Sequence, residues 1–160
     1  MIQEIIKRLA ERVFRLERRL DELSRPEVAT GRTMVDDLSS IANGSATTLT
    51  SSYQTIATSG AINLPAACRV LLIGNGTLQC TAFTAAQDTT FRLLDNGGEL
   101  DLKVATVQAI YDRATVTLMA FLTISTAAAH TFTVEAKKGS TSNTIITTAG
   151  NTEICWVVFR

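Results

Sequence analysis

Seven aliphatic residues near the start of the chain recur at alternating steps of four and three residues. This alternation is the repeat of a coiled-coil seam, in which the apolar a and d positions return every ~3.5 residues. Charged residues fill the outer positions, and Pro26 ends the helix because proline cannot continue it. We therefore predict a coiled-coil helix over residues 1–25, with a seam of Ile6, Val13 and Leu20 at a positions and Ile2, Leu9, Leu16 and Leu23 at d positions.

This helix needs a partner for its apolar stripe. A single helix of about 24 residues would be about 36 Å long, and it would be only marginally stable in water. The alternative is an amphipathic helix that lies on its own domain. The narrow stripe favours self-association over that alternative, because helices packed on a core usually carry a wider apolar face.

The number of helices in the bundle depends on residues beside the seam. Aliphatic β-branched residues at a with leucine at d favour two strands. Ile5 at g and Ala10 at e widen the apolar surface. The segment Arg12-Val13-Phe14-Arg15-Leu16-Glu17 also resembles the Arg-h-x-x-h-Glu pattern (h, hydrophobic) of short parallel trimers, in which Arg12 would pair with Glu17 of the next helix. We therefore predict a parallel homotrimer whose interface residues are Ile2, Ile6, Leu9, Arg12, Val13, Leu16, Glu17, Leu20 and Leu23.

Residues 26–46 differ in composition and predict a linker. This segment is rich in Gly, Asp and Ser. Val35, Leu38 and Ile41 allow one helical turn or a short strand within it.

From residue 47 onward, helical periodicity gives way to short runs rich in Val, Ile, Thr, Leu and Phe. Asp95-Asn96-Gly97-Gly98 is a strong hairpin signal, since Asn and Gly tolerate positive φ. We read Gly74-Asn75-Gly76 as another turn. The fold class is therefore predicted as mainly β, with residues 47–160 forming an antiparallel β-sandwich of the jelly-roll type. The expected strands are 48–57, 60–64, 69–73, 77–83, 89–94, 99–106, 114–125, 130–137, 143–147 and 153–159.

Three stretches of this segment resemble the trimeric jelly rolls of the C1q and tumour-necrosis-factor type, as found in bacteriophage fibres, spikes and decoration proteins. They are residues 48–56, the passage from Ala114 through His130 to Glu135, and the apolar strand Cys155–Phe159 at the end of the sequence. Such trimers are often preceded by a coiled coil, in agreement with residues 1–25. We expect the last strand to be an inner strand or to be covered by a neighbouring subunit.

The sequence offers few groups for chemistry. His130 is the only histidine, and we expect it to act as a hydrogen-bonding group at a turn or strand end. The odd number of cysteines (Cys68, Cys80 and Cys155) and their apolar neighbours favour buried free thiols over disulfides or zinc. Asp95, Glu99 and Asp101 gather around a hairpin, which predicts a solvated tip; a calcium or hydrolytic site is the alternative. We predict no catalytic residue, cofactor or metal.

Charge and hydropathy limit the partners. Fifteen basic and fifteen acidic residues cancel, so nothing favours nucleic acid. No segment has the length and hydropathy of a membrane span, and Met1–Leu23 does not have the pattern of a secretory signal. The resemblance to the trimeric jelly rolls of phage particles implies a non-enzymatic virion structural protein, assembled in the host cytoplasm as a homotrimeric fibre, spike or capsid decoration. It would contact other virion proteins and a glycan or protein of the host surface. The alternative is a carbohydrate-binding module or small glycan hydrolase displayed on a trimer.

Overall fold

The computed structural model describes residues 27–28, 32–33, 38, 40–139, 142–148 and 150–160. The chain divides into two compact units, Met1–Met34 and Val35–Arg160. In the first unit, β1 (Glu27–Val28) pairs antiparallel with β2 (Arg32–Thr33). The predicted coiled coil over residues 1–25 lies outside the described residues, so its helix and its trimer interface stay predictions.

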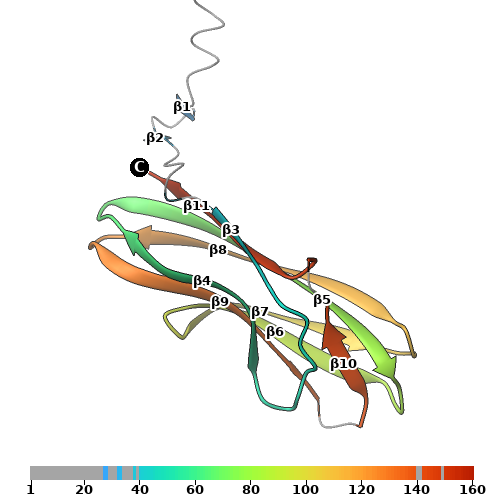
Figure 1. The fold of residues 1–160 in the computed structure, drawn as a ribbon. Helices are drawn as coiled ribbons and strands as arrows, with labels where there is room; N and C mark the ends of the chain where they lie inside the picture. The colour runs from blue at the N-terminus through green and yellow to red at the C-terminus, as the bar shows by residue number, and fades with distance from the viewer. Residues whose placement is uncertain (1–26, 29–31, 34–37, 39, 140–141, 149) are drawn as a thin grey trace, which may run out of the picture. The chain divides into compact units, whose positions relative to one another are not determined.

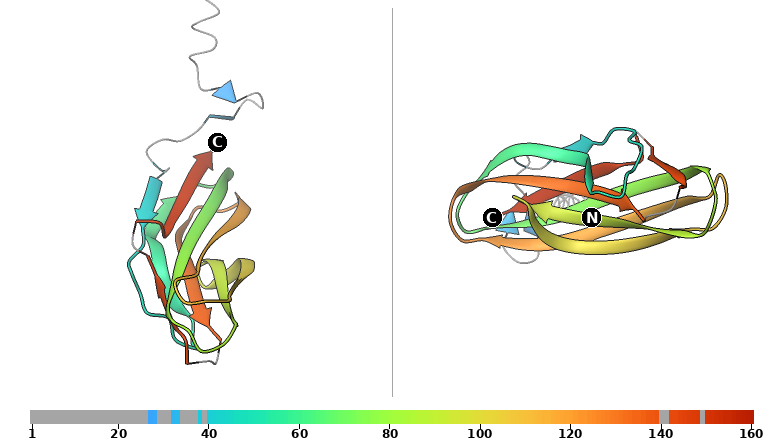
Figure 2. Two further views of the ribbon diagram at one scale, coloured as in Figure 1. Left: turned by 90° about the vertical axis from the view of Figure 1, so that its right-hand side faces the viewer. Right: turned by 90° about the horizontal axis from the view of Figure 1, so that it is seen from below.

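The second unit is mainly β and consists of two antiparallel sheets (Figure 1). The first, here called the β5 sheet, contains β3 (Ser40–Asn43), β5 (Cys68–Ala82), β8 (Arg113–Ile124), β10 (Thr144–Thr147) and β11 (Glu153–Phe159). The second, the β9 sheet, has the order β4-β9-β6-β7 and contains β4 (Gln54–Leu64), β6 (Gln87–Asp95), β7 (Gly98–Val107) and β9 (Ala128–Lys138). They pack face to face as a sandwich around one hydrophobic core (Figure 2).

Four antiparallel strand pairs account for the topology. They are β6 with β7, β5 with β8, β4 with β9, and β3 with β11, nested outward from a central hairpin. The pairs alternate between the two sheets, so the chain resembles one long hairpin that has been rolled up. β11 lies between β5 and β3, which confirms the inner position predicted for the last strand.

Alternation of apolar and polar residues places the core side chains. Phe132 and Val134 of β9 are fully buried, and Val116 and Leu118 of β8 also point into the core. From β11 the core receives Ile154, Trp156 and Val158. Strands with period-two apolar residues bury one face in this way, because successive side chains point to opposite sides.

The interpretation of Gly74-Asn75-Gly76 as a turn was wrong. These residues lie in the middle of β5, which joins two predicted strands into one of fifteen residues. A Cβ on Gly74 would lie 2.7 Å from Val134 Cγ2, and one on Gly76 would lie 2.5 Å from Phe91 Cε1. Glycine is therefore required here because the opposite sheet approaches the backbone closely.

The predicted break before Gly60 was wrong as well. β4 begins at Gln54, later than predicted, and runs through Gly60 to Leu64 with register shifts against β9. Gly60 has φ +70°, and the backbone N of Phe132 donates to Ser59 Oγ at 3.0 Å. This side-chain bond replaces a backbone bond where the bulge interrupts the ladder.

β3 lies inside residues 26–46, the segment for which a linker with a short strand as one option was predicted. It pairs with β11 from Asn43–Glu153 to Ser40–Trp156. Trp156 Nε1 also donates to the carbonyl O of Leu38 at 2.7 Å. These bonds add β3 to the edge of the β5 sheet.

Candidate functional site

The outward side of the β5 sheet carries an apolar surface, here called the apolar face. Cross-strand pairing places Met119, Ile73, Cys155 and Ile41 in one row, and Phe121, Leu71 and Val157 in the next. Phe159 stacks on Phe121 with ring centroids 6.5 Å apart. Ile41, Met119 and Phe121 are 59%, 56% and 57% exposed, and the other five side chains are half-buried.

Such a surface is unusual on a sandwich. An antiparallel sheet normally has one face on the core and a polar face toward water. Here β8, β5 and β11 carry apolar residues on both faces. Contiguous exposed apolar patches on soluble proteins mark sites of interaction with other molecules.

The signal for the apolar face was present in the sequence. Leu118-Met119-Ala120-Phe121-Leu122 and Cys155-Trp156-Val157-Val158-Phe159 are continuous apolar runs rather than alternating ones. Runs of this kind are typical of strands covered on both sides. For the last strand such a run predicted an inner position or a cover from a neighbouring subunit.

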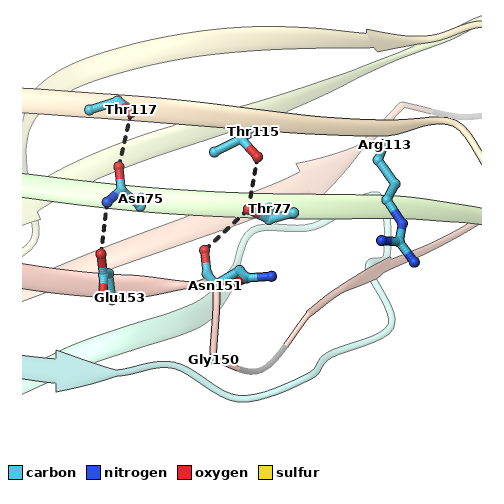
Figure 3. Close-up of a pocket in the computed structure, with 8 residues that line it drawn as sticks. All are labelled: Asn75, Thr77, Arg113, Thr115, Thr117, Gly150, Asn151 and Glu153. Carbon is cyan, nitrogen blue, oxygen red and sulfur yellow. Dashed lines mark hydrogen bonds between the residues drawn. The ribbon is translucent and has the colours of Figure 1, made fainter.

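The other end of the same sheet is polar and slightly hollowed (Figure 3). The hollow has a volume of about 660 Å³ and is lined by Asn75, Thr77, Arg113, Thr115, Thr117, Gly150, Asn151 and Glu153. Thr117 Oγ1 donates to Asn75 Oδ1 at 2.9 Å, and Asn75 Nδ2 donates to Glu153 Oε1 at 2.9 Å. Thr77 and Thr115 hydroxyls lie 3.0 Å apart. These groups bond across strands to one another and form the polar border of the apolar face.

The three carboxylates around the β6–β7 hairpin each have a different partner. Asp95 Oδ2 lies 2.8 Å from His130 Nδ1, and Glu99 Oε2 lies 3.9 Å from Arg92 Nη1. Asp101 Oδ2 accepts from the backbone N of Met119 at 3.0 Å. Among the described residues, no three His, Cys, Asp or Glu side chains are close enough together to hold a metal ion.

His130 pairs with the β6–β7 turn. Its ring nitrogen contacts Asp95, and next to it Asn96 accepts from the backbone N of Thr131 at 2.9 Å and donates to the carbonyl O of Ala129 at 3.1 Å. The prediction that His130 is a hydrogen-bonding group is confirmed. The contacts attach the turn to β9.

A second cluster lies on the β9 sheet. Arg92 Nε and Nη2 both donate to Glu135 Oε2, at 2.9 and 2.7 Å. The guanidinium carbon of Arg92 lies 3.7 Å from the centre of the Tyr53 ring, and Lys137 Nζ lies 4.4 Å from it. These residues link β6, β9 and the residue before β4 by one ion pair and two cation–π contacts.

The cysteine thiols are free. Cys68 and Cys80 are 1% and 0% exposed, and Cys155 is half-buried within the apolar face. Burial raises the pKa of all three thiols above the ordinary value. They are therefore protonated at neutral pH and act as small apolar side chains.

The trimer-interface residues that the sequence predicted lie outside the described residues. Within the described residues, no helix is both long and apolar enough to cross a bilayer.

No family model and no curated protein matches this chain. Among solved structures, one that is similar is a chain of the T13 viral particle of infectious bursal disease virus, with a TM-score of 0.40 and 10% identity over 76% of this chain and 35% of that one. A chain of the Gt strain of that virus gives a TM-score of 0.37 and 9% identity over 78% of this chain and 38% of that one. This chain thus spans little more than a third of those chains. Similarity at this level assigns neither a family nor a function.

Proposed function

We propose that this protein is a non-enzymatic structural protein of a virion, in which three copies assemble into a fibre, a spike or a capsid decoration of the bacteriophage kind. The observation that carries the proposal is the apolar face. It spans β8, β5, β11 and β3, and the described residues of one copy do not cover it.

The strand order supports a jelly-roll domain. When β10 is left out, the eight strands from β3 to β11 divide so that the β5 sheet contains the first, eighth, third and sixth, and the β9 sheet the second, seventh, fourth and fifth. A jelly roll is a double sheet of eight strands built from such wrapped antiparallel pairs. This agrees with the resemblance to C1q and tumour-necrosis-factor domains.

The expected coiled coil adds a reason for three copies. A parallel trimer of residues 1–25 would bring three sandwiches together at high effective concentration. The apolar faces would then bury one another even where the affinity between isolated sandwiches is weak. Covering a neighbour also adds the buried area that a domain of this size lacks.

Substitution of the most exposed aromatic residue of the apolar face tests this proposal. Phe121→Glu should leave the fold of each copy intact, because the side chain is 57% exposed, and it should weaken association between sandwiches by about tenfold or more. Sedimentation velocity of chains that begin at Thr33 measures the effect over a concentration series. Asn63→Glu, on an exposed position of β4 that pairs with Ala129, is the matched control and should change nothing. If both variants associated equally strongly, the apolar face would not be the interface between copies.

The place of the protein in a particle is a separate question. Cryo-electron microscopy of the parent virion distinguishes a fibre or spike from a capsid decoration by where the trimer sits. An intact virion without this protein would contradict the proposal. Glycan-array binding or saccharide cleavage by the purified chain would instead favour the carbohydrate-binding alternative.

A further inference from the structure

The polar hollow at one end of the β5 sheet has the size of a ligand site. Its volume is about 660 Å³, and pockets for small molecules measure roughly 300–1,000 Å³. It lies on the outward side of the sheet, next to the row of Met119, Ile73 and Cys155 that belongs to the apolar face. Because its lining is polar, a ligand that displaces water from it has to form hydrogen bonds with the wall.

Hydrogen bonds between neighbouring strands fix the groups at one end of the hollow. Thr117 Oγ1 donates its only proton to Asn75 Oδ1, and Asn75 Nδ2 donates to Glu153 Oε1 (Figure 3). The lone pairs of the Thr117 hydroxyl and the Oε2 atom of Glu153 have no hydrogen-bond partner among the described residues. This end of the hollow therefore offers oriented acceptors, to which the hydroxyl groups of a ligand can donate.

The next row of the hollow adds another acceptor. Thr77 Oγ1 donates to the carbonyl O of Asn151 at 3.2 Å, so the Thr115 hydroxyl, 3.0 Å away, has to be the donor to Thr77. The lone pairs of Thr115 Oγ1 are then left to accept from a ligand. Thr115 and Thr117 both occupy exposed positions of β8, so a ligand can reach the two hydroxyl oxygens.

Arg113 supplies a positive charge at the other end of the hollow. Its side chain extends from β8 across β5, where Nη2 donates to Gln79 Oε1 at 3.4 Å, a long hydrogen bond (Figure 3). The ion pairs within the part of the chain that the structure describes do not include Arg113. A guanidinium group with free donors is suited to bind a carboxylate through two parallel hydrogen bonds.

Strand register separates the two charged ends of the hollow. Arg113 pairs with Gln79 and Thr117 pairs with Asn75, so the two rows lie four residues apart, about 13 Å at a rise of ~3.3 Å per residue. Glu153 continues the row of Asn75 on β11. A ligand that contacts both ends is therefore longer than a single sugar ring. A carboxylate on this ligand favours the Arg113 end, because Glu153 repels it from the other end.

We propose that the polar hollow binds an acidic oligosaccharide, with the carboxylate on Arg113 and hydroxyl groups on Thr115, Thr117 and Glu153. This inference rests on the host-surface contact expected of the virion protein, and it names the site and the ligand class of that contact. A neutral sugar lacks the group that pairs with Arg113. An apolar ligand would leave the polar wall without hydrogen bonds, which is costly.

Isothermal titration calorimetry of the full chain tests the site. The probes are digalacturonate and sialyllactose, each with its methyl ester as the neutral counterpart of equal size. We expect one of the two acids to bind about tenfold or more tightly than its ester, because only the acid forms a charge-assisted pair with Arg113. The acid that shows this difference identifies the ligand as a uronate or a sialate.

Two substitutions separate the roles of charge and hydroxyl groups. Arg113→Gln should weaken binding of the acid by about tenfold or more and leave binding of the ester unchanged. Thr117→Val should weaken binding of both, because both use the hydroxyl oxygen. Arg69→Gln is the matched control, since Arg69 is exposed on the same sheet and pairs with Thr123, far from the hollow along β8. It should change neither affinity.

The possible results distinguish this inference from the proposed function. No binding of either acid, equal affinities for acid and ester, or an affinity that Arg113→Gln leaves unchanged would overturn the inference. The proposed virion role and self-association would then stand. Binding with the expected preference by a protein that cryo-electron microscopy does not find in the virion would support this inference. It would contradict the proposed function and favour the carbohydrate-binding alternative.

Discussion

Gly76 illustrates how one residue determines the spacing between the two sheets. A Cβ at this position would lie 2.5 and 2.6 Å from two carbons of the Phe91 ring, and both groups are buried. We therefore predict that Gly76→Ala lowers the free energy of unfolding by about 1–3 kcal/mol, because the ring cannot move without disturbing a packed core.

Urea denaturation of the unchanged protein and of Gly76→Ala measures this change. Gly98→Ala is the control: its Cβ would lie 3.3 Å from the carbonyl O of Asp95, at an exposed turn. The control should lose clearly less stability. If both variants lost the same amount, close packing at Gly76 would not be the reason for glycine there.

The buried thiols predict how stability depends on pH. Burial raises the pKa of Cys68 and Cys80 in the folded chain, whereas in the unfolded chain thiols titrate at about 8.5. Above about pH 8.5 the folded state thus holds thiol protons that the unfolded state releases. The contribution of the buried thiols to the free energy of unfolding is therefore complete below about pH 8.5 and is lost as the pH rises through the pKa of the folded state.

We therefore expect the free energy of unfolding to fall above about pH 8.5. Cys80→Ala should make that alkaline decline shallower, apart from a constant offset caused by the lost sulfur. Urea unfolding at several pH values from neutral to alkaline provides the test. If the free energy of unfolding fell equally steeply with pH in the unchanged protein and in Cys80→Ala, Cys80 would not contribute to the alkaline decline.

Among the elements, the β6–β7 hairpin depends on its turn. Asn96 and Gly97 have φ +48° and +83°, the pair of positive values that a two-residue hairpin turn of type I′ requires. We predict that Gly97→Ala costs about 1 kcal/mol, because a Cβ disfavours left-handed backbone geometry. Thermal or urea unfolding measures it. Gly97→Asn should be tolerated better, and a larger loss for Asn than for Ala would contradict this explanation.

The same hairpin was predictable from sequence, as were most strands after it. The predicted ranges 89–94, 99–106 and 153–159 agree with β6, β7 and β11 within two residues at each end. Local turn chemistry and alternation were sufficient there. They failed at Gly60 and at Gly74-Asn75-Gly76, where glycine accommodates a bulge or a neighbouring sheet within a continuous strand.

The apolar face depends on pairing between distant segments and could not be predicted from local patterns. Ile41 joins Met119 only because β3, β11, β5 and β8 are neighbours in that order. The seam of residues 1–25 differs, because its repeat can be recognised from neighbouring residues alone. Its trimer interface stays a prediction.

In the whole molecule, the coiled coil and the sandwich should both stabilise the trimer. We predict that Val13→Asp together with Leu16→Asp destabilises the trimer by several kcal/mol, because unpaired charges would be buried in the seam. Sedimentation equilibrium of the full chain measures the loss. Trimers that persist unchanged would show that the sandwich surfaces are sufficient without the seam.

Native mass spectrometry of the full chain, and of a chain that begins at Thr33, tests the central claim most directly. We predict that the full chain has three times the mass of one copy, and that the shorter chain associates more weakly through its apolar face. A full chain with the mass of a single copy at micromolar concentration would contradict the account, since the apolar face would then be stable in water without a partner.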